Sequence, residues 1–109
     1  MSIYLGDFEC KEDVQNNFRC GSLDNCHILL ASYSRFDYEG LAFVLFVENG
    51  KLYEVNGGHC SCYGLEDQWD PEETMLAALK HRIEKGNLNN QLEGYGQEVL
   101  DAITKLGLN

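Results

Sequence analysis

Residues 41–55 read LAFVLFVENGKLYEV, two runs of β-forming residues joined by a central Glu-Asn-Gly. Asn49-Gly50 between two such runs is the strongest short-range signal for a β-hairpin, because both residues accept the positive φ angles of a tight turn. The first run, residues 41–47, is apolar throughout, which is typical of a strand buried on both faces. We therefore expect a hairpin whose first strand lies at the centre of a sheet.

Other elements precede this hairpin. Residues 11–19 place Val14 and Phe18 one helical step apart, which predicts a short helix that stops near Gly21. Residues 27–33 read HILLASY and predict another buried strand, and the polar residues up to Gly40 predict a turn or loop. The sheet should therefore contain three antiparallel strands.

The last third of the chain predicts two helices. Asp70 can cap the first of them, Pro71 suits the first helical position, and Glu73 can complete a capping box. This helix should run to about Lys85 and end at Gly86, and a second should cover residues 95–106. Their buried stripes are expected at Met75, Leu76, Leu79 and Ile83, and at Val99, Leu100, Ile103 and Leu106. The sequence thus predicts a two-layered α+β fold, in which a short N-terminal helix precedes a three-stranded antiparallel sheet and two C-terminal helices pack on it.

A chain of 109 residues that is 44% hydrophobic is expected to form a single globular domain over residues 1–109. No apolar run approaches the roughly 20 residues that span a bilayer, and the N-terminus lacks the pattern of a secretory signal. We therefore expect a cytoplasmic protein. Its five cysteines, an odd number, then predict reduced thiols, with Cys10, Cys20 and Cys26 packed as small apolar side chains.

The chain is acidic, with a formal net charge of −10. This charge argues against direct binding to nucleic acid or to an anionic membrane. Residues 52–79 contain no Lys or Arg, and their acidic residues are Glu54, Glu66, Asp67, Asp70, Glu72 and Glu73. The pattern fits solubility and the chemistry of a helix start, or else a surface that docks on a basic protein in place of its nucleic acid.

Residues 57–64 read GGHCSCYG and gather two thiols and an imidazole at a glycine-rich position. Thiolate and imidazole are the groups that hold Zn²⁺ in tetrahedral sites, and a glycine bend could let them converge on one ion. We predict a structural zinc site formed by His59, Cys60, Cys62 and His81, and His27 and Asp37 are weaker alternatives for the distant ligand.

The same residues allow other interpretations. Cys60 or Cys62 could be a nucleophile activated by His59 or His81, but the surrounding negative charge would raise the pKa of a thiol and oppose formation of the thiolate. The two cysteines could also be packing residues beneath Tyr63, Leu65 and Trp69, and His81 could simply face solvent. A zinc site with three protein ligands and an open position would indicate an enzyme, whereas four protein ligands would indicate a binding module.

The stretches GLAFVLF (40–46), LYEVNGGHCSCYGLE (52–66) and QWDPEET (68–74) together resemble a family of small proteins encoded by bacteriophages and prophages. The resemblance covers about the middle third of the chain, and HCSCYGLE is its most distinctive part. It implies a setting in the host cytosol and a role in the contest between phage and host, where small acidic proteins act as anti-restriction or anti-CRISPR inhibitors.

We therefore expect a non-enzymatic protein, a monomer or small homo-oligomer, that contains one structural zinc. Its acidic surface should occlude a basic host protein that handles nucleic acid, such as a Cas nuclease of a CRISPR effector. Two other classes stay open, a small zinc- or thiol-dependent enzyme and a phage structural or regulatory protein.

Overall fold

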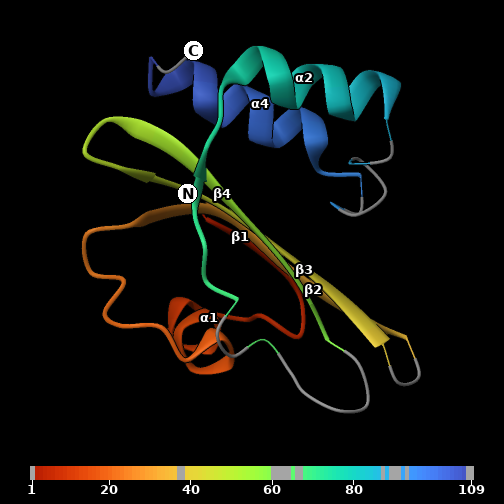
Figure 1. The fold of residues 1–109 in the computed structure, drawn as a ribbon. Helices are drawn as coiled ribbons and strands as arrows, with labels where there is room; N and C mark the ends of the chain where they lie inside the picture. The colour runs from red at the N-terminus through yellow and green to blue at the C-terminus, as the bar shows by residue number, and fades with distance from the viewer. Residues whose placement is uncertain are drawn as a thin grey trace.

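A five-stranded mixed sheet organises the chain in the computed structural model (Figure 1). The structure describes residues 2–36, 39–59, 65, 68–86, 88, 92 and 94–107. Its strands are β1 (Ile3–Gly6), β2 (His27–Phe36), β3 (Glu39–Glu48), β4 (Lys51–His59) and β5 (Glu72–Glu73). Its main helices are α1 (Lys11–Phe18), α2 (Leu76–Lys85) and α4 (Gly96–Lys105). The α+β prediction is confirmed.

The strands lie in the order β1-β2-β3-β4-β5, so β3 is central, as its apolar run predicts. The three predicted strands pair antiparallel as β2, β3 and β4, but the predicted number of strands is wrong, because β1 pairs in parallel with β2 and β5 pairs with β4. The strand β1 has four residues, too few for a recognisable pattern. The two glutamates of β5 have low β-propensity, and their extended backbone depends on hydrogen bonding to the edge of β4.

The predicted hairpin joins β3 and β4. Asn49 and Gly50 have φ angles of 54° and 76°, and Glu48 pairs with Lys51 across the turn. The predicted polar loop between the first two long strands is mostly strand instead, since β2 continues to Phe36 and β3 begins at Glu39. Cross-strand hydrogen bonds in an antiparallel pair stabilise this extension even where the side chains are polar.

A β-bulge in β2 sets which side chains face each side of the sheet. The register against β3 shifts between Ile28 and Leu30, which leaves Leu29 as the additional residue. Leu29 and Leu30 consequently belong to the same hydrophobic cluster, although side chains normally alternate along a strand. After the bulge the alternation resumes, with Ala31 and Tyr33 on the opposite face.

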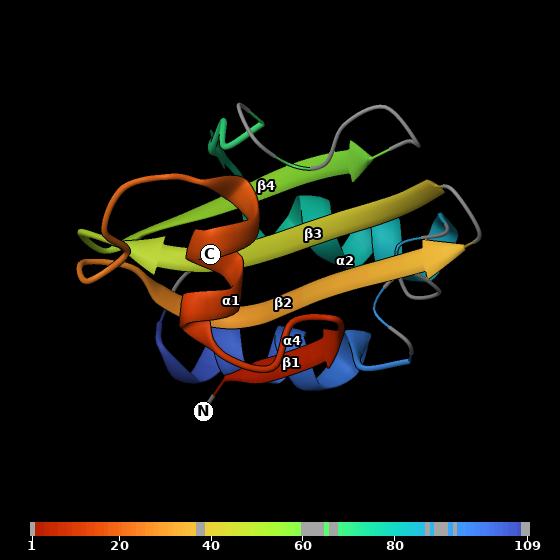
Figure 2. The same cartoon turned by 90° about the horizontal axis from the view of Figure 1, so that it is seen from below.

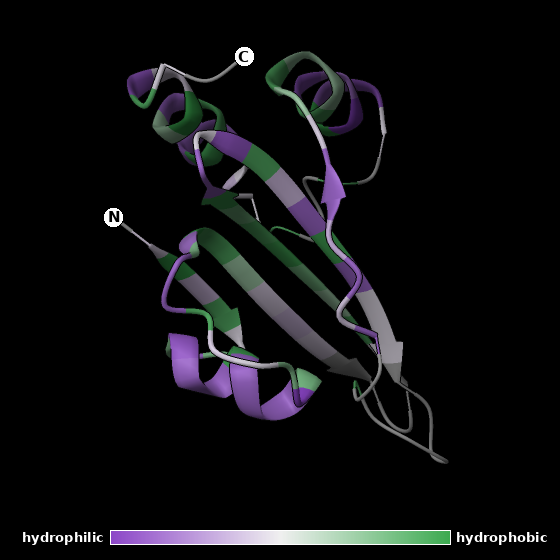
Figure 3. Cartoon of the chain, turned by 60° about the vertical axis from the view of Figure 1, so that its left-hand side comes forward, coloured by the Kyte–Doolittle hydropathy of each residue, from purple (hydrophilic) through white to green (hydrophobic). Residues whose placement is uncertain are grey.

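The sheet is covered on both faces, so the fold has three layers and the prediction of two is wrong. Helix α1 lies on one face and helices α2 and α4 lie on the other (Figures 1 and 2). Val14 and Phe18 of α1 pack on Val44 and Phe46 of β3 in one cluster. Leu79, Val99, Leu100 and Ile103 pack with Phe43, Leu45 and Leu52 in the other. Figure 3 shows the apolar residues of the helices turned toward the sheet. The short N-terminal helix forms a layer of its own because the central strand is apolar on both sides.

The predicted capping box at Asp70 is wrong. Pro71 precedes a short strand, Glu72 and Glu73 pair with β4, and the Thr74 backbone N–H donates to the Leu52 carbonyl at 2.9 Å. Helix α2 begins only at Leu76 and has Met75 as its N-cap. Met75 is therefore 54% exposed and does not belong to the buried stripe, whereas Leu79 is buried. The predicted stop at Gly86 is confirmed, since Gly86 is the C-cap of α2.

The ends of the other two helices also differ slightly from the prediction. Helix α1 ends at Arg19, which adopts a left-handed conformation before Gly21 is reached. Leu106 follows α4 and is 49% exposed, so it lies outside the core. Within the described ranges, the structure contains no helix of sufficient length and apolar character to span a bilayer.

Gly57 of β4 permits a close approach that a larger residue would prevent. A Cβ atom at this position would lie 3.1 Å from Phe18 Cε1 and 3.2 Å from Leu65 Cδ2. Both of these side chains are buried in the α1-side cluster. The glycine therefore lets Phe18 and Leu65 pack directly against the backbone of β4.

Substitution Gly57→Val should lower the free energy of unfolding by about 1–3 kcal/mol, because the valine side chain overpacks the contact with Phe18 and Leu65. The β-propensity of valine favours the strand, so a loss of stability isolates the steric effect. Urea unfolding curves measure the difference. Gly21→Val is the matched control, since a Cβ at Gly21 meets nothing within 4 Å. Equal midpoints for the two variants would contradict the assignment.

Candidate functional site

Gly57 and Gly58, which precede the predicted zinc ligands, are part of a strand and do not form a bend. Strand β4 continues through Gly57 and Gly58 to His59, which pairs with Gly40 of β3. Gly58 and Gly57 lie opposite Leu41 and Ala42 in the same ladder. Gly57 therefore has a packing role that is independent of any metal, whereas a Cβ at Gly58 would meet its neighbours only at ordinary contact distances, 3.4 and 3.8 Å.

An amide bridge from Gln68 to Gly58 joins the two ends of the segment that carries the cysteines. The Gly58 N–H donates to Gln68 Oε1 at 2.8 Å, and Gln68 Nε2 donates to the Gly58 carbonyl at 2.7 Å. The Gln68 N–H also donates to the carbonyl of Leu65, whose side chain is buried. The side-chain amide of Gln68 thus takes the place that a neighbouring strand would occupy at the edge of β4.

The four predicted zinc ligands are only partly described. His59 is the last residue of β4, and His81 lies on the exposed surface of α2. The His59 side chain, Cys60 and Cys62 fall outside the described residues. In Figure 1 the C-terminal end of β4 points away from the layer that contains α2. His81 is accordingly the least supported of the four ligands, and the zinc site stays a prediction.

The alternative ligands receive no further support. His27 is exposed at the start of β2, and Asp37 falls outside the described residues. Among the residues whose placement is described, no three His, Cys, Asp or Glu side chains come together in a group that could hold a metal ion.

The N-terminal cysteines are free thiols. Cys26 is buried, and Cys10 and Cys20 are half-buried, so Cys26 matches the predicted packing role most closely. Burial and the neighbouring Glu48 carboxylate raise the pKa of the Cys26 thiol to about 12. Cys26 is consequently a protonated thiol at neutral pH, unlike the thiolate that a nucleophilic cysteine requires.

A buried ion pair connects the sheet to helix α2. Glu54 is only 7% exposed, and its carboxylate accepts hydrogen bonds from Arg82 and from the Asn56 side-chain amide. Burial alone would raise the pKa of Glu54, but the hydrogen bonds from Arg82, Asn56 and Thr74 outweigh it and hold the pKa below the ordinary value. In the sequence Glu54 belongs to the anionic segment 52–79, and its pairing with Arg82 was not predicted. The sequence does indicate that Glu54 is buried, because Glu54 shares a strand face with the buried Leu52. It does not identify Arg82 as the partner.

The remaining described acids of the anionic segment form an exposed strip along the sheet edge. Asp70, Glu72 and Glu73 are all exposed, and Pro71 lies between them. The backbone of β5 is fixed by pairing with β4, so Glu72 and Glu73 are held at a rigid edge. We call Asp70, Glu72 and Glu73 the acidic edge.

An aromatic pocket of about 380 Å³ adjoins this edge on the α1 side of the sheet. Its lining includes Phe46, Tyr53 and Trp69, together with the polar side chains of Glu48 and Cys26. The Phe46 ring stacks against Tyr53 and against Trp69, with ring centroids 5.5 Å apart in each pair. In the sequence Trp69 was considered only as a residue that could pack over Cys60 and Cys62, and no pocket was predicted beside it.

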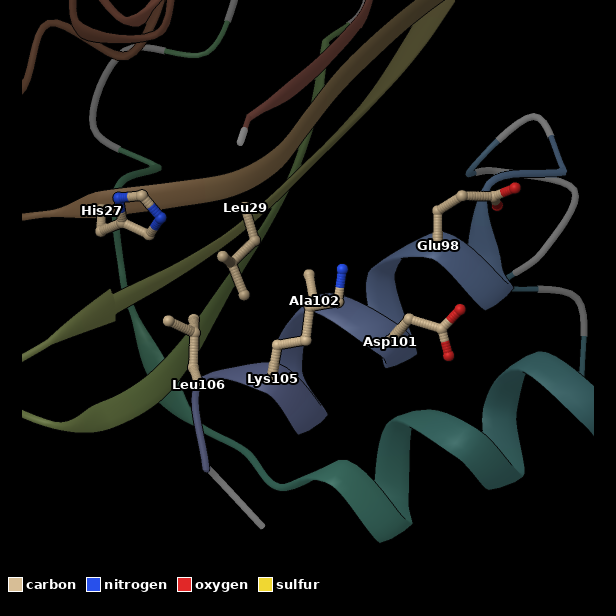
Figure 4. A pocket seen from close by; sticks show the side chains of 7 residues that line it. All are labelled: His27, Leu29, Glu98, Asp101, Ala102, Lys105 and Leu106. Atoms are coloured by element: carbon tan, nitrogen blue, oxygen red, sulfur yellow. The ribbon is translucent and has the colours of Figure 1, made fainter.

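A second pocket, of about 460 Å³, lies between the start of β2 and helix α4 (Figure 4). Leu29 and Ala102 meet across it, and Glu98, Asp101 and Lys105 of α4 line its outer side. All three charged residues are exposed to solvent. The pocket is therefore an apolar crevice between the helix and the sheet, and its charged groups are not arranged for acid-base chemistry.

Comparison of the chain with protein-family models, with curated proteins and with solved structures gave no match.

Metal content tests the zinc prediction directly. Protein purified without added metal should contain about one zinc per chain, and Cys60→Ser or Cys62→Ser should reduce that content several-fold, because each thiolate is a ligand in a site of four. Elemental analysis by mass spectrometry measures it. Cys26→Ser is the control, since Cys26 hydrogen-bonds to Glu48 and lies outside the cluster. Unchanged zinc in both cluster variants would eliminate the site.

The Glu54 network predicts a specific dependence of stability on pH. Because the folded-state pKa of Glu54 lies below the ordinary value of 4.5, its contribution is complete above that pH and is lost as the pH falls through the folded-state pKa. Glu54→Gln should lower the free energy of unfolding at pH 7 by about 1 kcal/mol, a modest value because the Arg82 side chain is 39% exposed. Denaturation at several pH values should show the difference shrinking below pH 4.5. Glu98→Gln, an exposed control, should show no such convergence.

Proposed function

We propose that this protein is a non-catalytic binding module that occludes a basic surface of a protein that handles nucleic acid. The acidic edge is the principal docking element. In this proposal the negative charge of the acidic edge complements the positive charge of the partner's surface. A Cas nuclease is the partner class implied by the resemblance of the HCSCYGLE region to phage proteins.

The observation that carries the proposal is the fixed placement of Glu72 and Glu73. Both residues are exposed, yet their backbone is hydrogen-bonded to β4 and bounded by the bond from Thr74 to Leu52. Because their backbone is already fixed, the two glutamates lose less conformational freedom on binding than residues of a flexible loop would, and their side chains project to opposite faces of the edge. Nucleic acid presents its phosphates to such proteins in a similar way, as closely spaced negative charges.

The charge balance of the described surface agrees with this role. Glu54, the buried acid among the described residues of the segment, is paired with Arg82 and does not contribute to the edge. Segment 52–79 contains no Lys or Arg that could offset the exposed acids locally. Among the described residues of the segment, the acids that are exposed to a partner are Asp70, Glu72 and Glu73.

The non-catalytic part of the proposal draws on the described residues only, since Cys60 and Cys62 fall outside them. The thiol of Cys26 is protonated, and the carboxylates along α4 are exposed rather than held in an enclosed site. Neither group forms the paired nucleophile and base that covalent catalysis uses. The structural zinc remains part of the proposal, as a support for the segment between Gly58 and Gln68.

The double variant Glu72→Lys/Glu73→Lys tests the docking element. We expect it to weaken binding to a basic nucleic-acid-handling protein by about tenfold or more, because two attractive charges become repulsive. The measurement is capture from nuclease-treated host lysate at low and high salt, followed by release with added duplex DNA or RNA. Wild-type capture should be lost at high salt and in the presence of competing nucleic acid.

Glu98→Lys/Asp101→Lys is the matched control, because it makes the same change of charge on α4, beside the opposite edge of the sheet (Figure 2). It should retain capture, and thermal melts should show that both double variants are folded. Capture that resists salt, or that falls equally in both variants, would overturn the docking role of the acidic edge.

A further inference from the structure

The aromatic pocket beside the acidic edge combines flat rings with a carboxylate. Phe46 is 3% exposed and forms its base, whereas Tyr53 and Trp69 are half-buried and present part of their rings to solvent. The planes of Phe46 and Trp69 differ by only 14°, and those of Phe46 and Tyr53 by 24°. The three rings are therefore nearly parallel and offer flat surfaces of similar orientation.

Contacts with Phe18 and the anchoring of Gln68 hold Trp69 in position. Phe18 of helix α1 contacts the indole edge-on, with centroids 5.2 Å apart and planes at 67°. Gln68, the preceding residue, is held by its amide bridge to Gly58. These contacts order the indole without a ligand, so a ligand would find one wall of the pocket already in place.

The carboxylate of Glu48 gives the pocket its charge. Its Oε1 atom accepts a hydrogen bond from Cys26 Sγ at 3.1 Å. Because the pKa of Cys26 is about 12, the thiol remains a donor and does not compete for a cation as a second anion. A carboxylate can accept about four hydrogen bonds, so Glu48 retains most of its capacity.

Basic side chains of the chain itself leave this charge available. Lys51 is the cross-strand partner of Glu48, and the charge of Lys11 acts on Cys26. Neither lysine forms an ion pair with Glu48 in the described part of the structure. A cation from a ligand can therefore bind at Glu48 without displacing a lysine of the chain itself.

A second carboxylate, that of Glu73, lies on the same face of the sheet. Phe46, Tyr53 and Glu73 are successive partners across β3, β4 and β5, and directly opposed residues share a face. Glu73 of the acidic edge thus lies on the face that carries the pocket, next to Tyr53. One carboxylate of the acidic edge therefore lies beside the pocket, whereas Glu72, which is opposite Glu54, faces the other side of the sheet.

We propose that the aromatic pocket binds an arginine side chain, with its guanidinium stacked on Trp69 and hydrogen-bonded to Glu48. The inference rests on the proposed function, in that the arginine belongs to the basic partner. Arginine fits better than lysine because its planar group stacks on an aromatic ring and pairs with a carboxylate in two parallel hydrogen bonds.

Trp69 is the only tryptophan of the chain, so its fluorescence reports on the pocket directly. Titration of the purified protein with N-acetyl-arginine amide should change that fluorescence with saturation, at a dissociation constant on the order of millimolar for so small a ligand. N-acetyl-citrulline amide has nearly the same shape without the charge and should bind about tenfold more weakly. This comparison uses the unaltered protein and does not depend on how a variant folds.

Glu48→Gln should weaken binding of the arginine amide by about tenfold, because it removes the charge and keeps the shape. Glu98→Gln on α4 is the matched control and should bind as the wild type does. Equal affinity for arginine and citrulline amides, or no saturable response of Trp69, would overturn the assignment of the pocket.

Different experimental results would contradict the docking role of the acidic edge and the binding of arginine in the pocket. Loss of salt-dependent capture with an intact response to arginine amide would remove the proposed function and keep the pocket. Capture that depends on Glu72 and Glu73, together with no preference for arginine amide, would keep the docking edge and remove the pocket.

Discussion

The structure depends on a central strand that must be buried on both faces. Phe43 and Leu45 of β3 face one cluster while Val44 and Phe46 face the other, and all four are almost fully buried. An isolated hairpin could not shield both sets from water, so helices have to cover each face. The bulge at Leu29 supplies a further apolar side chain to the face on which α2 and α4 pack.

The elements that sequence could predict are those with strong local signals. The Asn49-Gly50 turn, the central strand, helix α1 and the two C-terminal helices each have a clear pattern of their own. The missing strands have none, because β1 is short and β5 consists of two glutamates whose conformation comes from pairing with β4. The capping motif at Asp70 failed for the same reason, since tertiary hydrogen bonds replaced a favourable helix start.

The candidate site likewise has features that the sequence predicts and features that it does not. The concentration of acids near residue 70 was visible in the sequence, but the separate role of Glu54 needed the position of Arg82, 28 residues further along the chain. The aromatic pocket joins residues from the region near Cys26, from the hairpin and from Trp69. No local pattern connects these segments, and only the order of strands in the sheet brings them to one surface.

The amide bridge between Gly58 and Gln68 has a consequence for how this protein can vary. Two hydrogen bonds between the Gln68 side chain and the Gly58 backbone hold these two points of the chain together and so help to close the loop between them. Both anchors belong to the described fold, one at the edge of β4 and the other just before Trp69. A segment exchanged between them would begin and end at the same two places, which makes the bridge a natural pair of attachment points for engineering.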